Sequence, residues 1–228
     1  CLSGARVLVA MKHVGLNVAA DPLMTLTSIG VKGGLVVCVA DDPGMHSSQN
    51  EQDTRNYARF AKIPIFEPSD SQEAKDFVKT AMEVSEKYRT PVIIRSTTRI
   101  SHSRSMVELY DRVDLGREMG FEKDPPRFVP IPLWGREMRK RVEVRLGELT
   151  EYNNTTDLNK IEWNDKKLGI ITSSISYQYV KEVWPEASVL KLGCSYPFAD
   201  KLIKEFASEV DRLLIVEELD DIMEQHVK

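Results

Sequence analysis

Polar and titratable side chains follow three apolar runs of the sequence, each at the point where the run ends. The segments are KHVGLN (12–17), DDPGMHSSQN (41–50) and STTRISHSR (96–104). Imidazole, hydroxyl and amide groups can donate and accept hydrogen bonds, so together they suit the binding of a polar ligand. If the runs are neighbouring parallel strands, their carboxyl ends form one rim, where ligands of open sheets bind. The candidate binding residues are His13, Asn17, His46, Ser47, Ser48, Gln49, Asn50, Arg99 and His102.

Taken singly, these residues have a simpler interpretation, because Asn, Ser and Asp are favoured in turns and helix caps. Gly15 and Asn17 predict a tight turn into a helix, with Asn17 as the N-cap. The acids of the second segment are expected to cap and turn the chain, and none is assigned a catalytic role. These acids are Asp41, Asp42, Glu51 and Asp53. The concentration of polar residues in one loop favours the binding interpretation.

Familiar catalytic signatures are missing from the sequence. It contains no GxGxxG after a strand, no GxxxxGK followed by Ser or Thr, no GxSxG and no HExxH. Nicotinamide binding, P-loop hydrolysis, serine hydrolysis and zinc protease chemistry therefore lack support. HSSQ (46–49) places serine beside histidine, but neighbours in sequence rarely form a nucleophile–base pair. Cys1, Cys38 and Cys194 are too far apart for a CxxC pair, and we expect buried, reduced thiols that hold no iron–sulfur cluster.

Seven short apolar runs alternate with segments of helical spacing, which predicts an α/β fold with mainly parallel, doubly wound sheets. The expected strands are 5–11, 34–40, 63–68, 91–97, 168–174, 187–193 and 212–218. A helix is expected over 70–88, because apolar residues recur there at helical spacing and Ser69 and Gln72 have the spacing of a capping box.

The chain is expected to form two domains, 1–103 and 166–228, joined by a connector, 104–165, that carries one charged helix near 134–152. This helix has a basic cluster composed of Arg136, Arg139, Lys140 and Arg141. A solvated helix face is the favoured interpretation of the cluster, and binding of an anion is the alternative.

Composition excludes several classes of protein. The 228 residues are 42% hydrophobic and 29% charged with a net charge of −4, which argues against a nucleic-acid-binding protein. No apolar run is long enough for a membrane span and no secretory signal is visible, so we expect a cytoplasmic protein without a membrane partner. The chain begins with Cys directly before a strand, which suggests a piece of a longer polypeptide.

Longer stretches of the sequence resemble one family of enzymes. They are VAMKHVGLNVAADPLM, GVKGGLVVCVADDPGMHSSQNEQDTR, YARFAKIPIFEPSDSQEAKDFVK and TPVIIRSTTRISHSR. These strings resemble the large (alpha) subunit of indolepyruvate:ferredoxin oxidoreductases, which are thiamine-diphosphate-dependent 2-oxoacid oxidoreductases. The similarity is nearly continuous over 5–104 and weaker over 166–218.

The resemblance implies that 1–103 is most of a pyrimidine-binding-like domain and that 166–228 is similar to the transketolase C-terminal domain. Enzymes of this family oxidatively decarboxylate aryl pyruvates to acyl-CoA, and 4Fe-4S clusters pass the electrons to ferredoxin. The residues expected on the pyrimidine side of the cofactor are His13, Asn17, His46, Ser47, Gln49 and Asn50.

The chain departs from the family in what it lacks. The glutamate that activates the aminopyrimidine belongs to an NEKVA-like motif that is absent here, and Mg²⁺, the diphosphate and the clusters are bound elsewhere in the enzyme. We therefore expect an inactive internal fragment that binds no cofactor tightly. No residue of the chain is expected to be catalytic or to bind a metal. Its expected partners are the missing domains, a second (beta) subunit, ferredoxin and a second copy of the chain.

Two alternatives remain open at this point. The first is another thiamine diphosphate enzyme, such as a pyruvate:ferredoxin oxidoreductase or the beta subunit of a 2-oxoacid dehydrogenase. The second is a non-catalytic α/β scaffold whose polar rim docks a protein partner. An activity screen across aryl and alkyl 2-oxoacids would separate the enzymes, and light scattering would test the docking.

Overall fold

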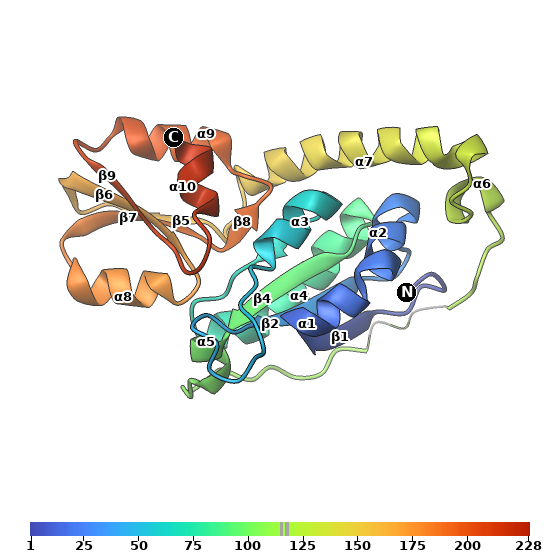
Figure 1. The fold of residues 1–228 in the computed structure, drawn as a ribbon, viewed down its shortest axis with the longest axis horizontal. Coiled ribbons are helices and arrows are strands. Elements are labelled where there is room, and N and C mark those ends of the chain that lie inside the picture. Colours follow the sequence, from blue (N-terminus) through green and yellow to red (C-terminus); the bar gives the residue numbers. More distant parts are fainter. Residues whose placement is uncertain (115, 117–118) are drawn as a thin grey trace.

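Two twisted sheets flanked by helices form the structure, a computed structural model that describes residues 1–114, 116 and 119–228 (Figure 1). The first sheet has the order β1-β2-β4-β3-β8 and is parallel except for β8, which runs antiparallel to β3. Its strands are β1 (Val7–Lys12), β2 (Leu35–Asp41), β3 (Ile65–Phe66), β4 (Val92–Thr97) and β8 (Cys194–Tyr196). The central strand pair, β2 and β4, is buried on both faces, as expected for strands that are apolar at successive residues.

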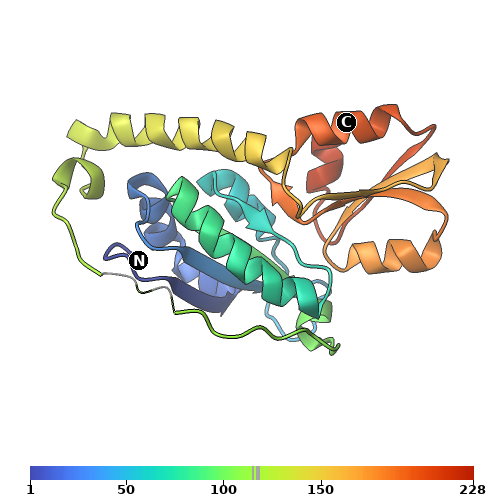
Figure 2. The ribbon, with the colours of Figure 1, turned by 180° about the vertical axis from the view of Figure 1, so that it is seen from behind.

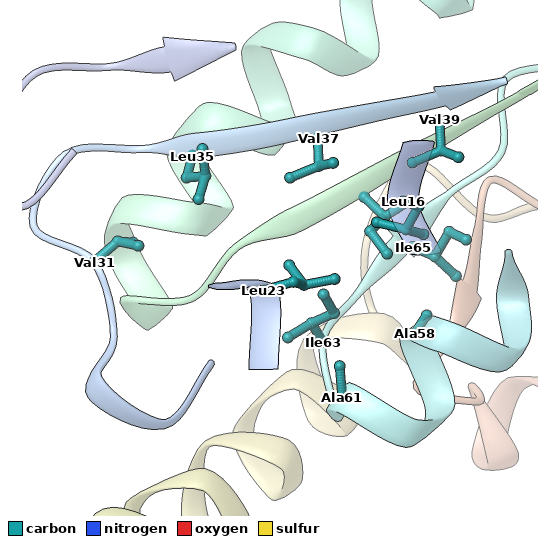
Figure 3. Close-up of a cluster of buried hydrophobic side chains, with 11 residues drawn as sticks. Leu16, Leu23, Val31, Leu35, Val37, Val39, Ala58, Ala61, Ile63 and Ile65 are labelled. Atoms are coloured by element: carbon teal, nitrogen blue, oxygen red, sulfur yellow. The ribbon is translucent and has the colours of Figure 1, made fainter. Parts of the chain in front are cut away.

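Helices cover both faces of the first sheet. They are α1 (His13–Val18), α2 (Ala20–Ile29), α3 (Arg55–Ala61), α4 (Ser71–Tyr88) and α5 (Thr98–His102). On one face Val37 and Val39 of β2 pack with Leu16, Leu23 and residues of α3 (Figure 3). On the other face Val36 packs with the apolar side of α4. The alternating side chains of β2 thus contribute to two separate cores, which anchors the carboxyl end of the strand.

Helix α4 agrees with the expected range within a residue, but its cap differs from the prediction. Asp70 is the N-cap and accepts a hydrogen bond from the amide of Glu73 at 2.8 Å. Ser69 lies one position earlier and donates its amide and hydroxyl to the Glu73 carboxylate. The expected pairing of Ser69 with Gln72 is therefore wrong, because an aspartate is available one residue closer to the first helical turn.

The second sheet has the order β5-β7-β6-β9, with β5 antiparallel and the others parallel. Its strands are β5 (Lys160–Glu162), β6 (Asp165–Ser173), β7 (Ala187–Leu192) and β9 (Leu213–Val216). Three helices flank it, α8 (Ser176–Val183), α9 (Asp200–Ser208) and α10 (Ile222–Val227). All seven predicted strands are present, and the α/β class with mainly parallel sheets is confirmed.

A long helix joins the two sheets. After the short α6 (Pro125–Phe128), α7 (Pro132–Asn153) passes along the helices of the first sheet and ends beside β8 (Figures 1 and 2). Leu149 of α7 is fully buried in the core beneath α4. The Asn153 amide donates to the carbonyl groups of Cys194 and Pro197, which fixes the end of α7 to β8. The division of the chain at 103 and 165 stays a prediction.

None of the helices formed by the described residues combines the length and the apolar character that crossing a membrane requires. The cysteines are free thiols, but only Cys194 is buried, whereas Cys1 and Cys38 are half-buried. The expectation of three buried thiols is therefore correct for one residue and too strong for the other two.

Candidate functional site

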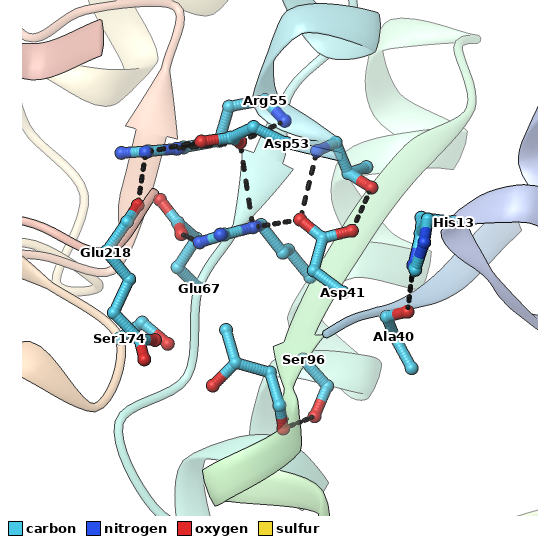
Figure 4. Close-up of polar contacts among 12 residues, drawn as sticks. His13, Ala40, Asp41, Asp53, Arg55, Glu67, Ser96, Ser174 and Glu218 are labelled. Carbon is cyan, nitrogen blue, oxygen red and sulfur yellow. Dashed lines mark hydrogen bonds and ion pairs between the residues drawn. The ribbon is translucent and has the colours of Figure 1, made fainter. Parts of the chain in front are cut away.

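The carboxyl ends of β1 and β2 are joined through His13, the first residue of α1. Its side chain is buried, with Nδ1 3.3 Å from the carbonyl oxygen of Ala40 (Figure 4). The Nε2 atom lies 3.2 Å from the carbonyl oxygen of Asn50. An imidazolium can donate to both carbonyl groups, whereas a neutral ring can donate to only one. His13 therefore connects α1 to the segment 42–54, which we call the polar loop, on the same edge of the sheet.

Asp42 organises the first turn of the polar loop. Its carboxylate accepts hydrogen bonds from the amides of His46 and Ser47 at 3.1 and 2.8 Å, and from the Thr98 hydroxyl at 2.6 Å. The hydrogen bond from Thr98, followed by that from the Ser47 amide, lowers the pKa of Asp42 well below its usual range. Glu51 closes the same turn by accepting the amide of Gly44, which has a φ of 81°. The acids thus cap and turn the chain, and Thr98 links the loop to β4.

The prediction that Asn17 is an N-cap is wrong. α1 begins at His13, directly after the last residue of β1, so Asn17 lies in the last turn of the helix instead of before its first turn. Its side-chain oxygen accepts a hydrogen bond from the Tyr57 hydroxyl at 2.6 Å. Asn17 is therefore exposed at the edge but connected to α3 and away from the His13 contact.

The other predicted residues lie on the exposed side of the polar loop. His46, Ser47, Gln49 and Asn50 are exposed and Ser48 is half-buried. Within the described part of the chain, the side chains of His46, Ser47 and Gln49 make no hydrogen bond, so their donors and acceptors face solvent. The structure thus brings His13 and the polar loop together and leaves three side chains uncommitted.

Arg99 and His102, the two candidates from the segment 96–104, do not belong to the contact between His13 and the polar loop. Arg99 and His102 are exposed on α5, and the Arg99 guanidinium lies 5.7 Å from the ring centre of Tyr179 in the second sheet's helix α8. They belong to the boundary between the sheets, not to the surface of the polar loop.

Beneath the edge lies a buried ionic cluster that connects the two sheets. Its members are Asp41, Asp53, Arg55, Glu67, Arg95 and Glu217. Arg95 Nε is 2.6 Å from Asp41, and Nη1 is 2.5 Å from Glu67. Arg55 binds Asp53 at 2.6 Å (Figure 4). Arg55 also reaches Glu217 at 2.5 Å, beyond the end of β9.

Electrostatics explains how these charges are tolerated in the interior. Burial alone would lower the pKa of Arg95, but the carboxylates of Glu67, Asp53 and Asp41 raise it far above its usual range. Burial would raise the pKa of Asp53, and Arg95 and Arg55 lower it. The charges are therefore retained because they are paired, and removal of any one leaves others uncompensated.

Glu218 follows Glu217 in the chain and borders the cluster, where its carbonyl group accepts a hydrogen bond from Arg55. Burial raises the pKa of its carboxyl group, which Arg95 and Thr97 lower only in part. Its Oε2 atom is buried without a hydrogen-bond partner among the described residues. A buried carboxyl group that is poorly compensated favours its neutral form.

Sequence reasoning missed Arg95 and Glu67. The only local signal is an arginine within the apolar run PVIIRST (91–97), where a buried strand should carry no charge unless the charge is paired. The partners come from other strands, so the pairing itself is not visible in the sequence.

The chemistry available at the edge is recognition by hydrogen bonding. Asp41, Asp42, Asp53 and Glu67 are each bound to other groups of the chain, so none is free to exchange a proton with a ligand. No cluster of three or more His, Cys, Asp or Glu side chains suited to a metal ion occurs over residues 1–114, 116 and 119–228. The arrangement suits one wall of a binding site.

Fold and edge together define an α/β protein with open, mainly parallel sheets and a polar edge at the carboxyl ends of adjacent strands, the position where such sheets typically bind ligands. The sequence model of the pyruvate flavodoxin/ferredoxin oxidoreductase, thiamine diphosphate-binding family matches residues 3–166. The chain belongs to this family.

Curated relatives agree with the family. Indolepyruvate oxidoreductase subunit IorA of Methanothermobacter thermautotrophicus is 46% identical over 99% of this chain and 37% of its own length. The subunit of the same name from Pyrococcus abyssi is 49% identical, with the same two coverages. The chain thus spans a little over a third of the length of these relatives.

A solved structure supports the architecture. The 2-oxoglutarate:ferredoxin oxidoreductase from Magnetococcus marinus superposes on all of this chain, and on 49% of its own, with a TM-score of 0.68 at 12% identity. At this identity the likeness shows the fold alone.

Proposed function

We propose that the chain is part of a 2-oxoacid:ferredoxin oxidoreductase that oxidatively decarboxylates aryl pyruvates such as indolepyruvate to acyl-CoA. Its part in that enzyme is to form one wall of the thiamine diphosphate site, on the pyrimidine side. The observation that carries the proposal is the contact of His13 with the polar loop, which presents uncommitted side chains at the carboxyl edge of a family-typical sheet.

The residues present fit one side of the cofactor. The aminopyrimidine has ring and amino nitrogens, which the exposed hydroxyl, amide and imidazole groups of His46, Ser47 and Gln49 can meet with hydrogen bonds. Thiamine diphosphate, when bound, supplies a carbanion, which is the nucleophile toward the carbonyl carbon of the 2-oxoacid. The chain's own residues bind and orient the ring, and His13 holds the loop in place from below.

The activating carboxylate must come from outside this chain. The acids of the polar loop and of the strands beneath it, Asp41, Asp42, Asp53 and Glu67, are already hydrogen-bonded or ion-paired, so promoting one would break the polar loop or the buried ionic cluster. We therefore propose that the isolated chain is inactive and binds thiamine diphosphate weakly, and that Mg²⁺ and 4Fe-4S clusters are bound by other parts of the enzyme.

The proposed partners are the remaining domains of the polypeptide, a beta subunit and ferredoxin, with a second copy of the chain as a further partner in the cytoplasm. The names of the similar proteins support a subunit of a larger assembly, because each is itself called a subunit. Aryl substrates are favoured because relatives called indolepyruvate oxidoreductase reach 40–49% identity, whereas one called 2-oxoglutarate synthase reaches 21%.

The test uses the full-length enzyme with His46→Gln and Ser47→Ala. Both variants should raise the KM for thiamine diphosphate about fivefold, because a lost hydrogen bond to a neutral group is worth about 1 kcal/mol. His226→Gln in α10, beside the second sheet, is the matched control and should leave that KM unchanged. Equal KM values for His46→Gln and the unmodified enzyme would contradict the proposed role of the polar loop.

Substrate class is tested on the same enzyme with indolepyruvate, phenylpyruvate, pyruvate and 2-oxoglutarate. The proposal expects the highest kcat/KM for the two aryl substrates. A preference for pyruvate or 2-oxoglutarate would instead support another enzyme of the same cofactor class.

A further inference from the structure

A second polar region lies at the opposite edge of the first sheet, where β2 and β4 begin. Gly30, just after α2, and Arg89, just after α4, line a cavity of about 260 Å³ there. Helices α6 and α7 form its other walls through Arg127 and the segment 141–148. The polar loop is at the far end of the same strands, so the cavity is separate from the proposed cofactor edge.

The lining of this cavity has a large excess of positive charge. Five cationic side chains meet one carboxylate, that of Glu148; they are Lys87, Arg89, Arg127, Arg141 and Arg145. None of the five forms an ion pair with any residue that the structure describes. The lining of the cavity therefore has four more cationic than anionic side chains, although Asp124 and Glu122 outside it also act on Arg127.

Arg145 is the buried centre of the cluster and is 8% exposed. Its Nη2 donates to the carbonyl of Thr27 at 2.5 Å and its Nη1 to that of Arg89 at 3.3 Å. The Nε–H is buried and has no partner within the described residues. A buried guanidinium N–H that is left unsatisfied costs free energy, and a ligand atom in the cavity would recover it.

Capping of helix ends accounts for part of this charge. Arg145 binds carbonyl groups at the ends of α2 and α4, and Arg127 binds the Val31 carbonyl at 3.1 Å. The end of a helix carries only about half a negative charge, so two helix ends balance about one cation. Lys87, Arg89 and Arg141 have no hydrogen bond to a carbonyl or carboxylate in the described chain, and the excess remains.

The arginines also destabilise one another. Burial and the charge of Arg141 lower the pKa of Arg145 to about 10. Burial, followed by the charges of Arg89 and Arg141, lowers the pKa of Arg127. Mutual repulsion of this kind is relieved when an anion occupies the space between the cations.

We propose that this cavity binds a small phosphate-bearing anion with two or more negative charges, of the size of a diphosphate group. Guanidinium groups match phosphate oxygens with paired hydrogen bonds, and three arginines from different elements converge here. Arg141 of the predicted basic cluster lines the cavity. Arg136, Arg139 and Lys140 are exposed on α7, and Glu143 and Glu137 pair the last two, as a solvated face predicts.

The test is calorimetric titration of the 228-residue chain with pyrophosphate, ADP and sodium acetate, at low and at physiological ionic strength. We expect one pyrophosphate per chain, no measurable heat with acetate, and binding that weakens as salt is added. ADP with an affinity equal to that of pyrophosphate would show that the diphosphate is the recognised group, and tighter ADP binding would show that a nucleoside adds contacts. Both results support the site.

Arg141→Gln is the decisive variant, because Arg141 is exposed and caps no helix, so its loss should not impair folding. It should weaken pyrophosphate binding at least about tenfold, as expected for a lost charge-assisted hydrogen bond. Arg136→Gln removes the same charge from the same helix outside the cavity and should change the affinity less than about twofold. Absence of pyrophosphate binding, or equal weakening by the two substitutions, would overturn the proposal.

Discussion

Arg95 Nε lies 2.6 Å from Oδ2 of Asp41, and the side chains of both residues are at most 1% exposed. The two residues come from neighbouring parallel strands, since Asp41 is the last residue of β2 and Arg95 lies two residues before the end of β4. Because Asp41 also accepts the amide of Thr54, the pair holds the polar loop to the sheet. The anchoring of the exposed polar loop therefore depends on a charge pair that is buried beneath it.

Arg95→Met should destabilise the chain by about 3–5 kcal/mol, because it leaves Asp41 and Glu67 buried without their cation. Urea unfolding measures this change. Arg99→Met, four residues later and exposed, should change the free energy of unfolding by less than about 0.5 kcal/mol. Similar midpoints for the two variants would show that the buried pair contributes little. Arg95→Lys, which keeps the charge, should lose less than the methionine variant.

Arg55→Met should loosen the connection between the two sheets. Arg55 links Asp53 of the first to Glu217 and to the carbonyl groups of Glu218 and Asp220 beyond the second. We expect faster hydrogen exchange over 213–224 and little change in β7. Arg59→Met on the exposed side of α3 is the control. Unaltered exchange in Arg55→Met would mean that packing alone holds the sheets together.

Stability should decline between acidic and neutral pH through Glu218. Burial raises the pKa of its carboxyl group in the folded chain, so the unfolded chain releases this proton at a lower pH. The folded state is therefore penalised as pH rises above the unfolded pKa of about 4.3. Glu218→Gln cannot ionise and should gain more stability at pH 7 than at pH 4. Thermal melts at the two pH values, with exposed Glu182→Gln as the control, measure the difference.

Cys38 and Cys194 should react at different rates with a thiol-specific reagent. Cys194 is buried, and burial raises its pKa far above the usual range, so it should react only after unfolding. Burial also raises the pKa of Cys38, which is only half-buried and should react slowly. Mass spectrometry after timed labelling of the native chain gives the order. Early labelling of Cys194 would show that β8 opens frequently.

Long periodic elements could be predicted from the sequence, because their signals are local. β2 is apolar at successive residues, and α4 has apolar residues at helical spacing. Both elements therefore appear close to the expected bounds. β5 and β8 have three residues each and form only by pairing with distant strands. No window of sequence around them carries a strand signal, and both were missed.

The candidate site likewise has features that the sequence predicts and features that it does not predict. The meeting of His13 with the polar loop follows from the adjacency of two parallel strands, which the sequence pattern predicts. The role of Asn17 was misjudged because the helix starts without any turn after Lys12. The buried ionic cluster could not be predicted, since its partners are brought together only by tertiary structure.

The placement of β8 affects how the chain can fold while it is being made. β8 completes the first sheet beside β3, although it follows β7 of the second sheet and lies near residue 195 of 228. At typical rates of synthesis, roughly 6–26 s separate the emergence of these two strands from the ribosome. During that interval the backbone of β3 has one free edge, the kind of surface that can pair with another chain. The first sheet can therefore be completed only after residue 196 has been translated.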